Sequence, residues 1–553
     1  MANDNNRKVF LIYRIIACLA FLVLLVRLFI IAIEGFGIQK SLYSDPKVAR
    51  EVIRGEIRDR NGNLLAIQTG QYALFFVMRN IDDLTKASMT VAPYLGMSID
   101  EVMQQASRYS VRGLIKRGLT EEVAAALQKA IEANGLEEGI VLEKYQGRSY
   151  PATFHASQLI GFVNTENKGL EGIEHAYDDI LLPYPELNEE LTYGDNITLT
   201  LDLNIQYLLD VQVQTIAMRD RPDYIMGMVM DARTGEVLAS SSYPWYDLNT
   251  YSTSDENARM NRCLGYTYEP GSVFKVFSLA AAMEAGVDTK TPFICDGEET
   301  FFHKGQSFTI TCHEAHGECD ARGMVAKSCN GAIASWALKM GDEYFEKFIR
   351  NLGFAQRYDV GLEGVTRGSL SDSKTWSARS QATISFGQEI SVNALQIVAA
   401  ATSLVDGELI RPSFIRKIEK HDGTITYESS IEKRRVFSSE TAEKIRSYMQ
   451  SATEEGTATL ARVKGIDVAA KTGTAQIINP ISRSYEDGTS LASTLALVPA
   501  DDPKYIVYFA ASAPNGDSIW GANVAAPSCG AIIRGLVSQG KLKVRGQEKL
   551  QLN

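Results

Sequence analysis

The sequence predicts an α+β protein made of an N-terminal transmembrane helix, a mixed α+β pedestal domain and a larger domain whose antiparallel sheet is flanked by helices. Three observations predict this organisation. Residues 9–33 are almost entirely apolar. Residues 34–195 mix strand and helix patterns, and residues 196–553 give strands, then helices, then three further strands. Residues 1–8 form a short tail before the first helix.

The composition is that of a globular protein with more than one domain. The chain has 553 residues, of which 45% are hydrophobic and 22% are charged. Its formal net charge of -11 argues against nucleic acid as a partner, because phosphate binding requires a basic surface.

The apolar segment 9–33 predicts an uncleaved membrane anchor. It contains only Tyr13, Arg14 and Arg27 as polar residues and is long enough as a helix to span a ~30 Å hydrocarbon core. Arg7 and Lys8 precede it, which places the N-terminus inside the cell. No small-residue cleavage site follows. We therefore expect a single-pass protein of the cytoplasmic membrane with its remaining domains outside; the alternative is a buried core helix.

The pedestal carries strand and helix signals without clustered catalytic residue types. Residues 54–62 read as a strand that ends in an Asn-Gly turn, and residues 64–66 and 72–78 read as two further strands. Helices are expected after Ser98, which forms a capping box with Glu101, and after Thr120. We interpret this region as a support or interaction module.

The larger domain begins and ends with strand patterns. A strand at 196–201 is followed by a hairpin at 224–239, and a helix is expected from Ser272 to about Ala285. The remaining predicted elements are helices within 323–354 and at 439–455 and 528–538, and strands at 468–478, 490–498 and 505–511.

One stretch carries the chemistry. Pro270-Gly271 delivers Ser272 to the first turn of an apolar helix, and Lys275 lies three residues on, on the same helix face. A serine hydroxyl becomes a useful nucleophile when a neighbouring base takes its proton. Four other Ser-x-x-Lys pairs occur in the chain, and none opens an apolar helix after Pro-Gly. Alone, Lys275 would read as a solvated helix lysine.

Two later motifs single this pair out. Ser328-Cys329-Asn330 and then Lys471-Thr472-Gly473-Thr474 follow it in order, and Lys471 begins the one Lys-Thr-Gly in the chain. This ordered trio is the signature set of penicillin-recognising serine acyltransferases.

The chain resembles class B penicillin-binding proteins over nearly its whole length, and most resembles the cell-division (FtsI/SpoVD-type) peptidoglycan D,D-transpeptidases. Elongation-type enzymes are the alternative branch. Ala470 and Glu389 depart from the family, which usually has Gly before Lys-Thr-Gly and often has Gly after Phe-Gly-Gln. The further segments that carry the resemblance are 54–62, 148–151, 169–174, 268–271, 384–392, 456–458 and 524–527.

The resemblance implies an acyl-enzyme mechanism. Ser272 would attack the carbonyl between the last two D-alanines of a peptidoglycan stem peptide, and Lys275 would take its proton. Ser328 would relay a proton to the leaving D-alanine. Asn330 would hold Lys275 and the donor amide. An amine of a second stem peptide would then form the cross-link, and β-lactams would acylate Ser272.

The resemblance also implies how the substrate is held. Lys471, with the hydroxyls of Thr472 and Thr474 beside Gly473, would bind the terminal carboxylate. The backbone N–H groups of Ser272 and Thr474 would form the oxyanion hole. The chemistry requires no metal and no cofactor.

A cysteine cluster between the first two motifs leaves three interpretations open. Cys295 and Cys312 could form a disulfide in an extracytoplasmic domain, or the thiols could be free. Cys312-His313-x-x-His316-x-x-Cys319 offers zinc-ligand types at an unusual spacing. Cys329 is expected simply to pack.

Several functions compete with cross-linking. A hydrolase with the same chemistry, a D,D-carboxypeptidase or β-lactamase, would not need the pedestal. A membrane-anchored division scaffold or a β-lactam sensor would be a non-enzymatic role. Besides stem peptides and β-lactams, the resemblance implies a SEDS-type (FtsW-like) glycan polymerase and other division proteins as partners. No nucleic acid is expected.

Overall fold

The computed structural model describes residues 21–22, 25–27, 51–185, 191–478, 485–512, 514–516 and 518–545. The expected tail 1–8, and the expected span 9–33 apart from five helical residues, lie outside these ranges. Among the helices that are described, none combines the length and the apolar character needed to cross a membrane. Residues 54–183 and 193–553 form one compact unit, described below. The strands β1 (Glu51–Ile53) and β6 (Leu191–Tyr193) form a two-stranded sheet.

A seven-stranded sheet builds the pedestal. Its order is β18-β17-β7-β2-β3-β4, with β5 also paired to β3. The pair β2–β7 is parallel, and the other pairs are antiparallel. The strands are β2 (Ile57–Arg58), β3 (Leu64–Val77), β4 (Arg112–Leu119), β5 (Ile140–Ser149), β7 (Asn196–Leu199), β17 (Ile415–Glu419) and β18 (Ile425–Glu428). Strands from before and after residue 195 therefore share one sheet.

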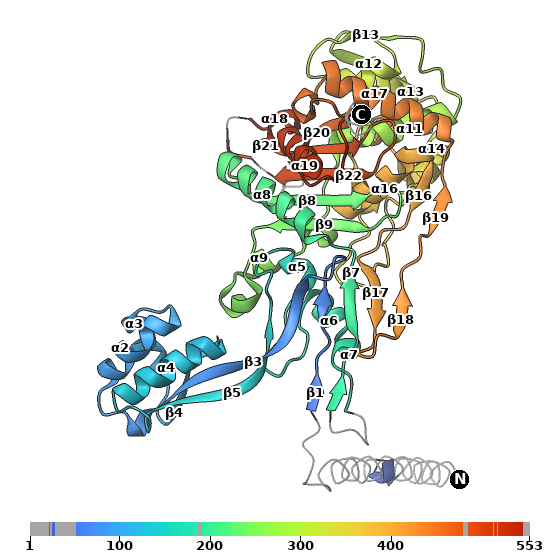
Figure 1. Ribbon diagram of the computed structural model, residues 1–553. Helices are drawn as coiled ribbons and strands as arrows, with labels where there is room; N and C mark the ends of the chain where they lie inside the picture. The colour runs from blue at the N-terminus through green and yellow to red at the C-terminus, as the bar shows by residue number, and fades with distance from the viewer. Residues whose placement is uncertain are drawn as a thin grey trace, which may run out of the picture. The chain divides into compact units, whose positions relative to one another are not determined.

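The predicted strands at 64–66 and 72–78 are one continuous strand, so that prediction was wrong. The polar run Gln68-Thr69-Gly70-Gln71 between them reads as a loop, yet β5 pairs along it from Ile67 to Phe76. Pairing with β5 satisfies the backbone groups that a lone strand would expose to water. Figure 1 shows β3 and β5 running side by side towards α2, α3 and α4.

These three helices close a small core at one end of β3. They are α2 (Leu84–Leu95), α3 (Ile99–Ala106) and α4 (Glu121–Ala133), and they bury Val91 and Leu127 against Phe76. The capping box at Ser98 is confirmed, and the Thr120 hydroxyl caps α4 as predicted.

The segment 54–62 contains only the short strand β2. Arg54 is turned inward, where its guanidinium meets Glu174 at 2.7 Å and Asp178 at 2.6 Å. Arg148 meets the same Glu174 at 2.7 Å, and the side chains of Arg54 and Glu174 are wholly buried. Three sequence segments that resemble the family are thus joined by one buried ion network.

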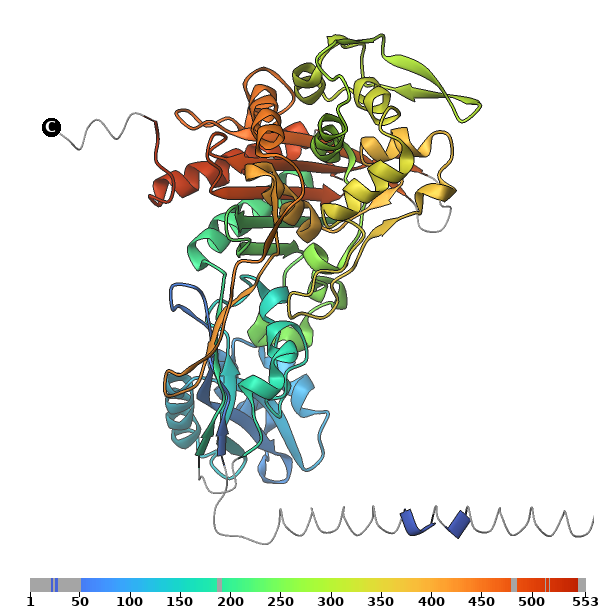
Figure 2. The same ribbon diagram turned by 90° about the vertical axis from the view of Figure 1, so that its right-hand side faces the viewer.

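The second sheet confirms the predicted antiparallel architecture. Its order is β20-β21-β22-β8-β9, and all its pairs are antiparallel. The helices α8 (Leu203–Asp220) and α19 (Ala526–Ser538) pack on one face, and α16 (Ala394–Asp406) and α17 (Ser439–Glu455) pack on the other (Figures 1 and 2). The strands are β8 (Tyr224–Asp231), β9 (Val237–Tyr243), β20 (Ala469–Ile478), β21 (Tyr485–Val498) and β22 (Tyr505–Ser512).

The segments between β9 and β20 contain the first two sequence motifs. The helices are α9 (Glu256–Arg259), α10 (Arg262–Gly265), α11 (Lys275–Glu284), α12 (Ala321–Lys327), α13 (Asn330–Ala337), α14 (Asp342–Asn351) and α15 (Ser380–Ser385). The short strands are β10 (Phe293–Cys295), β11 (Glu298–His303), β12 (Gln306–Thr311), β13 (Gly317–Cys319), β14 (Ser369–Leu370), β15 (Ile390–Ser391), β16 (Glu408–Ile410) and β19 (Lys433–Arg435). Elsewhere lie α5 (Ser157–Ile160), α6 (Gly172–Ala176), α7 (Asp178–Leu181) and α18 (Gly521–Val524).

Candidate active site

Ser272 lies in a 3₁₀ turn, Gly271–Phe274, that leads directly into α11. The sequence predicted that the α-helix begins at Ser272. In the structure it begins three residues later, at Lys275. Residues i and i+3 eclipse in a 3₁₀ turn, which keeps Ser272 and Lys275 on one side. Ser272 is half-buried, whereas its neighbours Val273 and Phe274 are fully buried.

Glycines let this turn sit tightly in the site. Gly271 has φ +57° and donates its N–H to the Gly387 carbonyl at 3.0 Å. A Cβ at Gly271 would lie 3.0 Å from the Thr474 carbonyl of β20, and one at Gly473 would lie 2.9 Å from Val273. The serine turn and β20 are thus in direct backbone contact.

The two motif lysines meet at one hydroxyl. Lys275 and Lys471 are completely buried. The Lys275 ammonium donates to the Ser328 hydroxyl at 3.1 Å and also to the Ser328 carbonyl, and the Lys471 ammonium donates to the same hydroxyl at 2.9 Å. Ser328 therefore bridges the first and third motifs.

Burial also sets the charge of these lysines. Loss of hydration lowers the pKa of Lys275 to about 8. Burial, and then the nearby charge of Lys275, hold the pKa of Lys471 well below its usual range. A lysine with a pKa of about 8 is partly neutral near neutral pH, as a general base must be.

Ser328 holds its place through an unusual backbone. It caps the C-terminus of α12 in the left-handed region, with φ +62° and ψ +40°. This conformation costs a non-glycine residue about 1 kcal/mol or more, and such residues cluster at functional sites. The same turn starts α13 at Asn330, whose side-chain amide donates to the Thr311 carbonyl at 2.9 Å.

The strand β20 carries the third motif along the sheet edge next to the serine turn. The Thr472 hydroxyl donates to the Thr457 hydroxyl at 2.8 Å. The Thr474 hydroxyl accepts from the Gly521 N–H at 3.2 Å. Thr457 and Gly521 support the motif hydroxyls, and the sequence pointed to Thr457 only through the Gly-Thr-Ala segment that resembles the family.

Glu389 stands where the family often has glycine, and hydrogen bonds to its carboxylate hold it there. It adopts φ +57°, a conformation that glycine reaches without strain. Its carboxylate accepts from the hydroxyls of Ser380 at 2.7 Å and Thr383 at 2.6 Å. These bonds hold the turn beside Gly387.

The cysteines in the described residues are free thiols. Cys295 and Cys312, the pair considered for a disulfide, are among them. The two sulfurs lie 3.6 Å apart. The ring of His313, which the sequence grouped with possible zinc ligands, instead packs against the Trp520 ring at a tilt of 56°, with ring centroids 4.7 Å apart.

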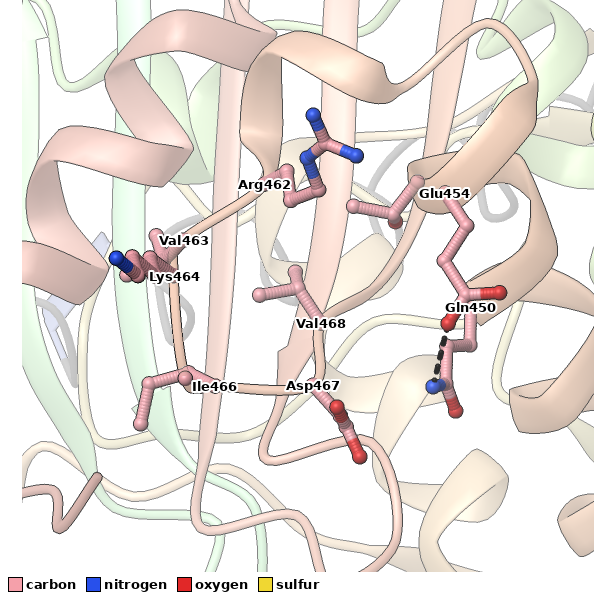
Figure 3. Close-up of a pocket in the computed structure, with 10 residues that line it drawn as sticks. Gln450, Glu454, Arg462, Val463, Lys464, Ile466, Asp467 and Val468 are labelled. Carbon is pink, nitrogen blue, oxygen red and sulfur yellow. Dashed lines mark hydrogen bonds between the residues drawn. The ribbon is translucent and has the colours of Figure 1, made fainter. Parts of the chain in front are cut away.

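A pocket between the end of α17 and the start of β20 lies apart from this chemistry. Gln450 and Glu454 line one side, and Arg462, Lys464 and Asp467 line the other (Figure 3). None of the three motifs contributes a residue to this pocket.

Comparison with known families decides the identity of the larger domain. Residues 225–534 match the model of the penicillin binding protein transpeptidase domain, and residues 49–186 match the penicillin-binding protein dimerisation domain. The chain belongs to the penicillin-binding protein transpeptidase family. The class B penicillin-binding proteins, with their FtsI/SpoVD-type members, are its relatives.

Individual relatives of this penicillin-binding protein span most of its length. Stage V sporulation protein D of Bacillus subtilis is 30% identical over 97% of this chain and 86% of its own. The probable peptidoglycan D,D-transpeptidase FtsI of Caulobacter vibrioides is 29% identical over 87% of this chain and 80% of its own. The fold matches penicillin-binding protein 3 from Mycobacterium tuberculosis, complexed with aztreonam, with TM-score 0.72 and 24% identity over 90% of this chain and 98% of that one.

Proposed function

We propose that this protein is a serine D,D-transpeptidase that cross-links peptidoglycan stem peptides during septal wall synthesis. The observation that carries the proposal is the meeting of Lys275 and Lys471 at the Ser328 hydroxyl, with Lys275 three residues on from Ser272. A buried lysine one turn from a serine supplies a base, and a shared hydroxyl supplies a path for the proton.

In the first half-reaction, neutral Lys275 takes the Ser272 proton as Oγ attacks the carbonyl between the two terminal D-alanines. The backbone N–H groups of Ser272 and Thr474 stabilise the oxyanion, each contributing roughly 3 kcal/mol. The Ser328 hydroxyl passes a proton to the leaving amine. The C–N bond breaks, D-alanine leaves and an ester to Ser272 remains.

In the second half-reaction, an amine of a neighbouring stem peptide attacks this ester. The amine loses its proton through Ser328 towards the lysines, the new amide forms the cross-link and Ser272 recovers its hydrogen. In this proposal Asn330, at the start of α13, would contact the donor amide, and Thr472 and Thr474 would bind the terminal carboxylate with Lys471. β-Lactams imitate the donor and acylate Ser272.

We further propose that the protein is anchored by residues 9–33, with its N-terminus inside and its catalytic domain outside the cytoplasmic membrane. In this setting a SEDS-type (FtsW-like) polymerase would supply glycan strands, and other division proteins would bind the pedestal. We also propose domain limits of 34–195 and 196–553. One sheet, which contains β2, β3, β7 and β17, takes strands from both sides of this boundary.

The test is labelling with a fluorescent penicillin. Wild type is expected to label covalently, and Ser272→Ala is expected to abolish labelling. Ser430→Ala, which alters an exposed serine of another Ser-x-x-Lys pair, is the matched control and should label normally. Failure of wild type to label, or equal labelling of Ser272→Ala, would contradict the proposal.

Three further measurements separate the competing roles. Incubation with a donor peptide and an amine acceptor should give the cross-linked product, whereas a D,D-carboxypeptidase or β-lactamase would give hydrolysis alone. A tagged copy should gather at mid-cell, whereas dispersed wall patches would indicate the elongation branch. A scaffold or sensor would support division with Ser272→Ala as well as with wild type.

A further inference from the structure

Four side chains from three segments bring their ligand-type atoms together beneath the second motif. Cys295 ends β10, Cys312 follows β12, His316 precedes β13 and Cys329 lies between α12 and α13. One sulfur or nitrogen atom from each lies within 4.8 Å of all the others. The sequence-based grouping of Cys312 with His313, His316 and Cys319 had only two of these four.

The separations fit a tetrahedral metal. Sulfur ligands ~2.3 Å and nitrogen ligands ~2.0 Å from zinc lie about 3.8 Å apart when both are sulfur and about 3.5 Å apart for sulfur and nitrogen. The observed separations are 3.6 Å for Cys295–Cys312 and 3.8 Å for Cys312–Cys329. Cys295 Sγ lies 3.4 Å from His316 Nδ1.

Backbone amides already point at the sulfurs. The Cys312 sulfur accepts from the N–H groups of Asn330 at 3.2 Å and Gly331 at 3.4 Å. The Cys329 sulfur accepts from the Ala332 N–H at 3.4 Å. Such donors stabilise negative charge on sulfur, and outer hydrogen bonds of this kind orient metal ligands. These N–H groups would stabilise the sulfurs as thiolate ligands of a cation.

The surrounding charges and connections favour an anionic cluster. Lys327 donates its ammonium to the His316 carbonyl at 2.8 Å, and buried Lys275 donates to the carbonyl of Ser328, the neighbour of Cys329. Three thiolates and one neutral imidazole around Zn²⁺ carry a net charge of about -1, which the Lys327 ammonium beside His316 offsets.

We propose that Cys295, Cys312, His316 and Cys329 bind one structural Zn²⁺. Binding releases the three thiol protons to solvent and forms three Zn–S bonds and one Zn–N bond, with no redox change. All four positions are filled by protein, so the ion has no open site for substrate. A disulfide would engage only two of the four, and Cys312 has two sulfur neighbours at nearly equal distances.

The ion would hold the turn between α12 and α13, which contains Ser328, Cys329 and Asn330, in a fixed position. Cys329 lies between Ser328 and Asn330, so fixing its sulfur to β10 and to the segment after β12 holds the left-handed turn of Ser328. That turn is what presents the hydroxyl to Lys275 and Lys471. The ion is therefore a positioning element for the second motif and takes no part in bond making.

The test measures metal without any turnover, so its outcome is separate from that of the proposed transpeptidase activity. Full-length protein is purified under reducing conditions and its zinc content is measured by mass spectrometry. About one zinc per chain is expected. Apo protein titrated with Co²⁺ alone should develop the absorption of a tetrahedral thiolate complex, and a chelator should lower the Tm of wild type.

Variants identify the ligands. Cys295→Ser and His316→Ala should each weaken zinc binding about tenfold or more. His313→Ala, which alters the neighbouring histidine outside the cluster, and Cys263→Ser, which alters a buried free thiol elsewhere, should retain zinc. If a ligand variant does not fold, the Co²⁺ titration of wild type still decides.

Three outcomes would overturn the proposal. Reduced wild type could lack zinc and give no Co²⁺ complex. His313→Ala could lose the metal as His316→Ala does. Protein isolated without reductant could hold a Cys295–Cys312 disulfide and take up no metal after reduction.

Discussion

At the scale of single residues, two buried ammonium groups donate hydrogen bonds to the hydroxyl of one serine, Ser328. Lys275 and Lys471 both contact Ser328 Oγ, and both lose hydration completely. Two positive charges this close together in a site without water repel each other. Over part of the neutral pH range, the two lysines are therefore not both protonated. In the proposed mechanism, this arrangement would make Lys275 a base and would give Ser328 a proton to relay.

The first prediction concerns pH. In the proposed mechanism the neutral form of Lys275 is the base, and the neutral fraction rises steeply with pH until the pH passes the pKa of about 8. The acylation rate by a penicillin should rise about tenfold per pH unit below that pKa and level off above it. Stopped-flow acylation across the neutral range measures this. Lys275→Met should lose the slope and about 10²- to 10⁴-fold of the rate; a flat wild-type profile below pH 8 would exclude Lys275 as the base.

At the scale of elements, the site depends on close contact between the serine turn and β20. Glycines make this contact, because Gly271, Gly473 and Gly521 each lie where a side chain would meet backbone or buried atoms. At Gly521 a Cβ would lie 2.3 Å from the Gly473 carbonyl. Strand β20 is therefore in close contact both with helix α18 and with the serine turn, residues 271–274.

The second prediction follows from that contact. In Gly473→Ala, the new Cβ would lie 2.5 Å from Ser493 Oγ and 2.9 Å from Val273, which forces β20 away from the serine turn. Overpacking of this kind costs about 1–3 kcal/mol, and acylation should fall about tenfold or more. Gly70→Ala in β3 is the control, because its Cβ meets only the mobile end of Lys144. Normal acylation by Gly473→Ala would show that the contact is dispensable.

At the scale of the whole described unit, the pedestal and the catalytic domain share structure. The strand β7 pairs with β2 on one side and with β17 on the other, and β17 follows α16 and β16 of the catalytic domain. Deep inside the pedestal, Arg54, Arg148 and Glu174 form an ion network closed to solvent. Such a network adds little net stability, but removing one member leaves a buried unpaired charge.

The third prediction concerns this network. Glu174→Gln should lower the free energy of unfolding by about 3–5 kcal/mol, because both guanidinium groups lose their shared carboxylate. Glu143→Gln breaks an exposed pair with Arg112 and should cost less than about 1 kcal/mol. Denaturant unfolding followed by circular dichroism measures both. Equal effects of the two substitutions would contradict the role assigned to the buried network.

Features that depend on local order could be predicted from short stretches of sequence. The strands at β20, β21 and β22, the caps at Ser98 and Thr120, and the ordered trio of Ser272, Ser328 and Lys471 are written in short-range patterns. Periodicity and capping act over a few residues, so they survive without knowledge of the fold. The resemblance to the family depended on such short segments as well.

Contacts between groups that are distant in sequence emerged from the folded structure. It joined 64–66 to 72–78 as one strand by pairing with β5, and it placed Thr457 beside Thr472. It brought Cys329 to the cluster of Cys295, Cys312 and His316, and it left His313 and Cys319 out of that group. Burial and long-range approach arise from packing of the whole chain, which no spacing within a motif records.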